Sequence, residues 1–247
     1  KASKSLIRDF GEIEKLQVSV KGPSDFVSSA DKKVEETLIE DLKKSRPEYS
    51  ILSEEMGEIK NKNSAYRWVI DPIDGTLNFL HGIPHFAISV GLEKNNEIIC
   101  GVIFDPIKNE MFFAEKDHGA YLNNQRIKTS NRKKIKDCLI FTGGPSYDYE
   151  NKEQDLKDYT KISNHISSPL RKMGSASLDI AYIAAGRADG FFQRNLQYWD
   201  IAAGIIILKE AGGILCDYKG NSDFITKKNL IASNSNINSD LVDLLNH

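Results

Sequence analysis

Apolar and polar residues follow one another along the chain in patterns that predict amphipathic helices and short strands. Leu6, Ile7 and Phe10 have helical spacing near the start, and over 31–45 apolar residues recur every four positions before Pro47. We therefore predict two helices, the second ending before the proline. Strands with intervening Asn-Asn turns at 95–96 and 123–124 are predicted at 49–52, 66–70, 86–92 and 98–104.

From residue 137 onward the pattern changes to alternating strands and helices. Strands are predicted at 138–142, 190–192, 214–217 and 230–232, and helices at 152–166, 175–185, 201–211 and 239–245. Such alternation is typical of α/β folds. We predict an α+β N-terminal half over 1–136 and an α/β C-terminal half over 137–247, with a site between them.

Composition disfavours several classes of protein but does not indicate a specific function. The 247 residues are 40% hydrophobic and 28% charged, as in ordinary globular proteins, and the net charge of −2 disfavours a protein built to bind a nucleic-acid backbone. No apolar run approaches the ~18 residues of a membrane span, and the N-terminus has no signal-peptide core. Cys100, Cys138 and Cys216 are too scattered for a disulfide framework, so we expect buried thiols and a cytoplasmic protein.

The segment over 68–79, W-V-I-D-P-I-D-G-T-L-N-F, is the most informative for chemistry. A strand should deliver Asp71 at its end, and a turn forced by Pro72 should point Asp74 back toward it. Two such carboxylates repel each other unless a cation intervenes, and oxygen ligands favour Mg²⁺ or Mn²⁺ over Zn²⁺. Gly75 and Thr76 follow at a predicted helix start, where free N–H groups can bind an anion. The same residues could also form a plain hydrophilic turn.

Two further segments supply carboxylates near predicted element ends. The run S-E-E-M-G at 53–57 follows a strand, although such a charge pair is often only solvated. Asp200 opens an apolar helix, where an N-cap role is the simpler interpretation. The sequence has no Asp-x-Asp pair resembling the nucleophilic aspartyl phosphatases, and no phosphate-binding P-loop, H-E-x-x-H or G-x-S-x-G motif. A metal-activated water remains as the chemical route.

Together these motifs resemble the inositol monophosphatase family, within the lithium-sensitive, Mg²⁺-dependent phosphatase superfamily. The resemblance rests on the 68–79 segment, on W-D-I-A-A-G at 199–204 and on K-G-P-S-D-F-V-S at 21–28, and it covers nearly the whole chain. It implies a layered αβαβα sandwich of the inositol monophosphatase/fructose-1,6-bisphosphatase type and a homodimer. It also implies two or three Mg²⁺ ions and hydrolysis of a small phosphate monoester, first of all inositol 1-phosphate.

The resemblance also assigns expected roles to individual residues. Glu55, Asp71 and the Ile73 carbonyl should bind one Mg²⁺, and Asp71, Asp74 and Asp200 a second. Thr76, hydrogen-bonded toward Glu55, should help to deprotonate the attacking water, and Asp74 belongs to the same catalytic group. Lys21 lies on a segment that is a mobile loop near the metals in this family, although it could equally be a solvated lysine. The expected substrate contacts are Ile73, Asp74, Gly75, Thr76, Arg171, Gly174, Ser175, Ala176, Gln193 and Asp200.

The sequence departs from the family pattern at Gln193, where inositol monophosphatases typically have Glu. An amide both accepts and donates and has no charge, so strict preference for inositol is in doubt. Alternatives within the fold are phosphatases of fructose 1,6-bisphosphate, 3′-phosphoadenosine 5′-phosphate or histidinol phosphate. An RNA- or transcription-associated protein is a further alternative, supported only by the basic run at 132–136. His81 and His85 flank Pro84, which disfavours a helical metal pair, so we expect structural roles for both.

Overall fold

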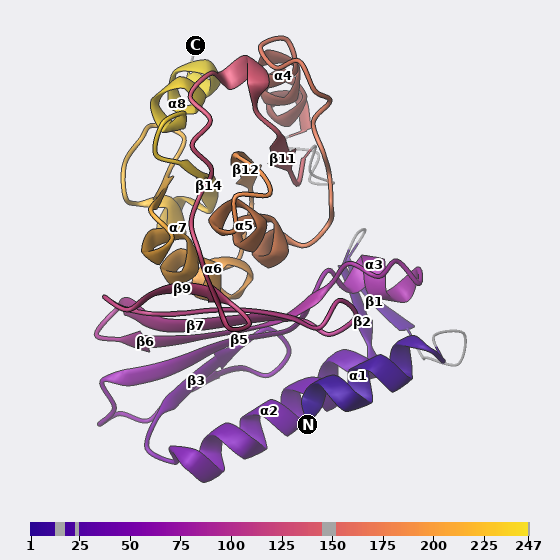
Figure 1. The fold of residues 1–247 in the computed structure, drawn as a ribbon. Helices are drawn as coiled ribbons and strands as arrows, with labels where there is room; N and C mark the ends of the chain where they lie inside the picture. Colours follow the sequence, from indigo (N-terminus) through magenta and orange to yellow (C-terminus); the bar gives the residue numbers. More distant parts are fainter. Residues whose placement is uncertain (13–17, 23–24, 145–151, 247) are drawn as a thin grey trace.

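The computed structural model describes residues 1–12, 18–22, 25–144 and 152–246 of the chain. Five layers are stacked in it: a pair of helices, a large sheet, a second pair of helices, a small sheet and a third pair of helices (Figure 1). This is the predicted αβαβα order. The three helical layers contain α1 (Ala2–Phe10) and α2 (Ser29–Ser45), α5 (Ala176–Ala184) and α6 (Tyr198–Glu210), and α4 (Lys152–Ser163) and α8 (Asn238–Asn246).

The large sheet has the strand order β10-β9-β8-β7-β6-β5-β3-β4. It is antiparallel except where β3 and β5 run parallel. Asn95 and Asn96 both have positive φ (50° and 65°), as the predicted two-residue hairpin turn requires. The strands are β3 (Ser50–Ser53), β4 (Gly57–Ile59), β5 (Tyr66–Asp74), β6 (Ala87–Lys94), β7 (Glu97–Asp105), β8 (Glu110–Glu115), β9 (Gly119–Leu122) and β10 (Gln125–Ile127).

The small sheet has the order β11-β12-β14-β13 and mixed strand directions. Only β11 and β12 run parallel, whereas β14 is antiparallel to both of its neighbours. The alternation of strands and helices in the second half is therefore confirmed, and the directions, which that pattern leaves open, are mixed. Its strands are β11 (Ile140–Thr142), β12 (Gly190–Arg194), β13 (Gly213–Cys216) and β14 (Asn229–Asn234).

Five short elements complete the described fold. A hairpin of two strands lies beside the helices of the first layer, and Lys21 belongs to it, but the Lys21 side chain is outside the described residues. No helix within the described ranges is both long and apolar enough to span a bilayer. These elements are β1 (Val18–Gly22), β2 (Asp25–Ser28), α3 (Thr76–Leu80), α7 (Phe224–Lys227) and a single 3₁₀ turn at Ile135–Asp137.

Helix α6 lies at the centre of the molecule and is buried along eight consecutive residues, from Ile201 to Leu208. It packs against the large sheet at two glycines. A Cβ at Gly101 would lie 2.6 Å from the Ala203 carbonyl oxygen, and one at Gly91 would lie 3.2 Å from Ala202 Cβ. Any larger residue there would push the helix off the sheet, so these glycines set how closely α6 approaches β6 and β7.

The expected boundary between 136 and 137 falls in the connection between the two sheets. The large sheet ends at Ile127 and the small sheet begins at Ile140. The main hydrophobic core includes Val69 of the large sheet and Phe191 of the small sheet. The two halves thus share one core, and their independence as domains stays a prediction.

Candidate active site

A β-bulge in β5 brings two carboxylates to the same face of the sheet. Asp71 pairs with Ser89 and Asp74 pairs with Ala87, so three steps along β5 match two steps along β6. In a regular strand, residues three apart face opposite sides, and one extra residue restores the same side. The expected turn at Pro72 is therefore wrong, because β5 continues through it to Asp74. The expected result, two aspartates facing one space, is what the bulge produces.

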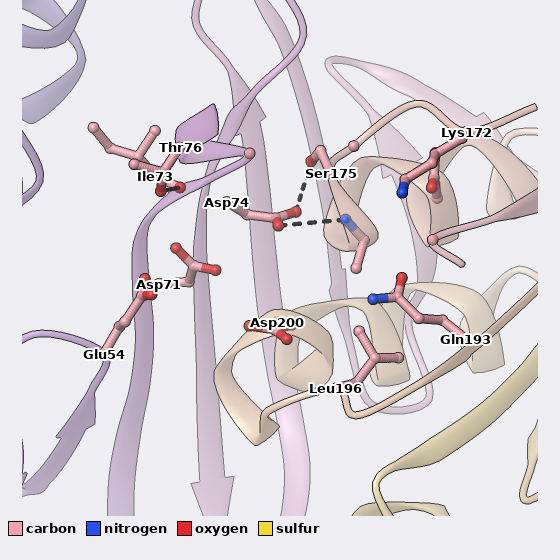
Figure 2. A pocket seen from close by; sticks show the side chains of 15 residues that line it. Glu54, Asp71, Ile73, Asp74, Thr76, Lys172, Ser175, Gln193, Leu196 and Asp200 are labelled. Atoms are coloured by element: carbon pink, nitrogen blue, oxygen red, sulfur yellow. Dashed lines mark hydrogen bonds between the residues drawn. The ribbon is translucent and has the colours of Figure 1, made fainter. Parts of the chain in front are cut away.

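Both aspartates line a cavity of about 200 Å³ between the large sheet, α5 and α6 (Figure 2). Carboxylates from β5, from the end of β3 and from α6 line one side of it. Lys172 and Gln193 line the other side. The cavity is lined by Glu54, Asp71, Ile73, Asp74, Gly75, Thr76, Gly143, Lys172, Gly174, Ser175, Ala176, Asp179, Gln193, Leu196 and Asp200.

Glu54, and not the expected Glu55, is the carboxylate that lines the cavity from the end of β3. The Glu54 N–H donates to the Ile70 carbonyl (3.3 Å), which extends the parallel pairing with β5 and places Glu54 beside Asp71. The next two N–H groups, of Glu55 and Met56, turn away and donate to the buried carboxylate of Glu35. The turn thus rotates the backbone of Glu55 toward α2, and the expected metal-binding role of Glu55 stays a prediction.

Asp74 is held by the first turn of α5. Its Oδ2 accepts hydrogen bonds from the Ser175 hydroxyl (2.6 Å) and from the Ser177 N–H (2.7 Å), and its Oδ1 accepts a long one from the Ala176 N–H (3.3 Å). Ser175 also caps α5 by accepting from the Leu178 N–H, so the expected cap is present as well. Burial raises the pKa of Asp74, and these hydrogen bonds to its ionised form oppose that rise. Asp74 therefore joins β5 to α5 across the cavity.

Asp200 lies in the first turn of α6 but is not its N-cap. The helix begins earlier than expected, at Tyr198, and Asp200 closes a capping box in which its carboxylate accepts from the Gln197 N–H (2.8 Å). Burial, followed by the charge of Asp74, raises the pKa of Asp200 to about 7. The hydrogen bond from the Gln197 N–H and the charge of Lys228 oppose this rise in pKa but do not cancel it.

Asp71 is the most strongly perturbed of these acids. Burial raises its pKa well above the usual range, and the negative charges of Glu54, Asp74, Asp200 and Asp31 add to the rise. Its Oδ1 is buried and has no hydrogen-bond partner among the described residues. A buried carboxylate oxygen without a hydrogen-bond partner, among several like charges, is a feature of a cation-binding site.

The donor set fits a hydrated Mg²⁺ ion better than a fully protein-bound metal. Within the described ranges, no three His, Cys, Asp or Glu side chains converge closely enough to enclose an ion. Mg²⁺ usually keeps several waters and takes only one or two carboxylates directly, so acids spread over the cavity walls are compatible with it. Among the residues that the structure describes, no Cys or His lines the cavity, which disfavours Zn²⁺.

The start of α3 has the geometry expected for Gly75 but a different contact for Thr76. Gly75 has φ of 96°, and a Cβ there would lie 3.1 Å from the His85 carbonyl oxygen, so glycine is required for both conformation and space. The Thr76 hydroxyl donates to the Ile73 carbonyl (2.8 Å) and not toward Glu55 as expected. The cause is the one-residue shift above: Glu55 does not line the cavity.

Gln193 lines the cavity as expected, on the side away from the acids. A Cβ at Gly143 would lie 1.8 Å from the Gln193 Oε1, so this glycine makes room for the amide. The basic neighbour is Lys172 and not Arg171. The Arg171 guanidinium is exposed and donates to the Pro169 carbonyl (3.4 Å), whereas Lys172 lines the cavity and burial lowers its pKa.

A model of the inositol monophosphatase family matches residues 1–246 of the chain. The chain belongs to the inositol monophosphatase family. A relative from Rhizobium meliloti (strain 1021), named inositol-1-monophosphatase, is 48% identical over 237 residues, covering 96% of this chain and 89% of the relative. A relative from Pasteurella multocida (strain Pm70), named Nus factor SuhB, is 37% identical over 94% of this chain and 87% of its own length.

The solved structure of extragenic suppressor protein suhB from Bartonella henselae matches this fold with a TM-score of 0.95. It is 46% identical in sequence, and the match covers 99% of this chain and 93% of that one. The layered sandwich expected for the family is thereby confirmed. Relatives of this chain thus have two kinds of name, inositol-1-monophosphatase and Nus factor SuhB.

Family motifs and sequence patterns missed several residues of the cavity. Asp31, in the first turn of α2, is 1% exposed and adds negative charge near Asp71. Asp179, one turn into α5, is equally buried, and burial followed by the charge of Asp74 raises its pKa. Both are acids in the first turn of a helix, where acidic side chains are common because they interact favourably with the helix dipole. The sequence pattern therefore gave no reason to assign them to the cavity. Gly143, Lys172 and Leu196 also line the cavity and were not expected to.

The two histidines do not form a pair. His81 is exposed, whereas His85 is 6% exposed, packs edge-on against Tyr182 and has no partner for its Nε2 among the described residues. Burial, followed by the charge of Lys108, lowers the pKa of His85 to about 4. His85 is therefore a neutral side chain in the core at neutral pH, as the structural interpretation expects.

Proposed function

We propose that this protein is a Mg²⁺-dependent phosphatase of small phosphate monoesters, with inositol 1-phosphate as the first candidate substrate. One observation supports this most strongly: five carboxylates from four separate parts of the chain line one cavity, and Lys172 is the sole cationic side chain among the described residues that line it. A cavity of about 200 Å³ is below the ~300–1,000 Å³ of drug-sized sites, so it favours a small ligand. One of these acids is Asp179, and the four that we assign to metal binding are Glu54, Asp71, Asp74 and Asp200.

The same four acids, with the Ile73 carbonyl, would hold two or three Mg²⁺ ions. Bound Mg²⁺ would supply charge neutralisation and an activated water for in-line displacement at phosphorus. Asp71 lies between the other acids and is the candidate bridge. Glu54 replaces Glu55 in this proposal because it is the residue that lines the cavity. The Ile73 oxygen already accepts from Thr76, which leaves its second lone pair for a ligand.

The remaining cavity residues would bind the phosphate and the leaving group. N–H groups at Gly75 and Thr76 belong to the first turn of α3, where backbone donors have no intrahelical partner. Because α3 has only five residues, these donors and not a helix dipole would bind the phosphate. Gln193 and Lys172 would contact the leaving group. The Ser175 hydroxyl is engaged with Asp74, so its role toward substrate would be indirect.

The direct test is phosphate release from inositol 1-phosphate, glycerol 2-phosphate and fructose 1,6-bisphosphate, with Mg²⁺ and with excess EDTA. We expect turnover that needs Mg²⁺ and is inhibited by lithium, as the family resemblance implies. Asp71→Asn should abolish turnover while the protein stays folded. Turnover that persists in excess EDTA, or no turnover of any monoester with Mg²⁺, would refute the proposal.

A role in transcription is the second candidate, favoured by the relatives named Nus factor SuhB. The basic run at 132–136 is its physical support here. Lys133, Lys134 and Lys136 are exposed, but Arg132 forms an ion pair with the buried Asp189 (3.0 Å) and is partly structural. Three lysines and a net charge of −2 favour at most weak nucleic-acid binding. An RNA titration over a salt series tests it, and salt-independent or absent binding would end this candidate.

Two further expectations concern the protein in the cell. We propose a homodimer, from the family resemblance alone, and a cytoplasmic location, from the scattered cysteines. Sedimentation that gives only the 27.7 kDa monomer at micromolar concentration would contradict the first.

A further inference from the structure

Three side chains outside the cavity form a partly buried hydrogen-bonded group at the start of α6. Glu93 of β6 is 6% exposed and accepts from the Tyr198 hydroxyl (2.6 Å) and from the Arg67 guanidinium (2.9 Å) through the same oxygen, Oε2. Arg67 and Glu93 are direct cross-strand partners on β5 and β6. The Arg67 guanidinium also lies 5.8 Å from the centre of the Tyr198 ring. The group therefore joins the large sheet to the first residue of α6.

This connection adds a polar contact to the apolar packing of α6. On the side of the sheet, Ala202 lies against Gly91 and Ile206 lies against Gly101. A hydrogen bond at the end of a helix specifies its axial position, since its length changes steeply when the helix slides. The first turn of α6 has a second long-range hydrogen bond, from Lys228 to Gln197 (3.0 Å), but that one is exposed.

The position of the first turn of α6 decides where Asp200 lies. Asp200 is two residues after Tyr198, and its local hydrogen bond to the Gln197 N–H keeps it fixed to the helix but not to the sheet. Asp71 lines the same side of the cavity and belongs to β5, next to the strand of Glu93. Like charges on α6 and β5 push the two elements apart, and the Tyr198–Glu93 bond opposes that movement.

We infer that Tyr198, Glu93 and Arg67 form a positioning unit that fixes where Asp200 lies relative to Asp71, and thereby supports binding of a divalent cation. The inference rests on the proposed function, in which both aspartates bind the cation. None of the three residues lines the cavity, so the effect is transmitted through the helix backbone. Tyr198 is the best of the three positioning residues to substitute, because Tyr198→Phe deletes only the hydroxyl group and keeps the ring against Arg67.

The test is Mn²⁺ binding without substrate, followed by electron paramagnetic resonance, with thermal unfolding measured in parallel. Tyr198→Phe should weaken Mn²⁺ binding about tenfold, the low end for outer contacts of metal ligands, because the contact acts through the helix. Glu93→Gln should weaken it in the same direction. In the Asp200→Asn background, Tyr198→Phe should have no further effect on Mn²⁺, since the carboxylate that it positions is absent.

Two controls separate positioning from loss of stability. Ile207→Val removes one buried methyl group from the far half of α6 and should lower the melting temperature without weakening Mn²⁺ binding. Tyr121→Phe removes a hydroxyl bonded to the His118 carbonyl (3.3 Å) on the same sheet and should also leave Mn²⁺ binding unchanged. Equal weakening in Ile207→Val, or an undiminished effect in the Asp200→Asn background, would overturn the inference. If the unmodified protein binds no Mn²⁺, the proposed function fails instead.

Discussion

Replacing Gln193 by Glu tests whether this residue faces the leaving group. A carboxylate accepts charge-assisted hydrogen bonds from ring hydroxyls, which are roughly twice as strong as bonds to an amide. The gain for inositol 1-phosphate should be about 1–2 kcal/mol, which corresponds to roughly a fivefold to thirtyfold change in KM. Lys172, on the same side of the cavity, should tolerate the added charge, and the acids lie on the opposite side.

The assay is the ratio of kcat/KM for inositol 1-phosphate over that for glycerol 2-phosphate. We expect a broad substrate range for the unmodified protein and a higher ratio for Gln193→Glu, mostly through KM. Gly143→Ala is a matched control, because a Cβ there would occupy the place of the Gln193 amide and displace it. The backbone at Gly143 is not in the positive-φ region, so alanine is tolerated there.

The double variant Gly143→Ala with Gln193→Glu gives the sharper result. If Gln193 acts from its observed position, the Glu substitution should no longer raise the ratio once alanine has displaced the side chain. A ratio that does not rise in the single Gln193→Glu variant would mean that residue 193 does not contact the substrate. A ratio that rises equally with Gly143 and with alanine at position 143 would mean that the Gln193→Glu substitution does not act from the position that the Gln193 side chain occupies in the structure.

Two further predictions concern the acids and His85. Glu54→Gln should lower Mg²⁺ affinity at least about tenfold, whereas Glu55→Gln should change it little. Mg²⁺ titrations of activity compare the two variants. Equal losses of affinity would mean that Glu55 contributes to Mg²⁺ binding as much as Glu54 does. His85 has a pKa of about 4 in the folded protein against 6.5 when unfolded, so the unfolded state binds the proton first and stability falls as pH drops from 6.5 toward 4. The loss from this residue should reach about 2 kcal/mol at pH 5. Urea unfolding at pH 7 and pH 5 should show a smaller loss for His85→Gln, and an identical loss would contradict the buried neutral histidine.

Sequence periodicity was sufficient for most helices and strands because each is a local pattern with its own stop signal. The helix before Pro47 and the hairpin at Asn95 and Asn96 are examples, and both are present. Local pattern also located the chemistry, since Asp71, Asp74 and Asp200 all line one cavity. Their motifs are contiguous in sequence, so no knowledge of packing was needed to choose them.

Tertiary structure decided which of two adjacent side chains faces the cavity. Glu54 rather than Glu55, and Lys172 rather than Arg171, are one-residue differences, and neighbouring residues point in different directions. That direction depends on long-range bonds, such as the N–H groups of Glu55 and Met56 to Glu35, which no local pattern encodes. The bulge at Asp71 has the same origin, because it exists only relative to the register of β6. Motif spacing thus determined where the site is, and strand register and helix docking determined which atoms line it.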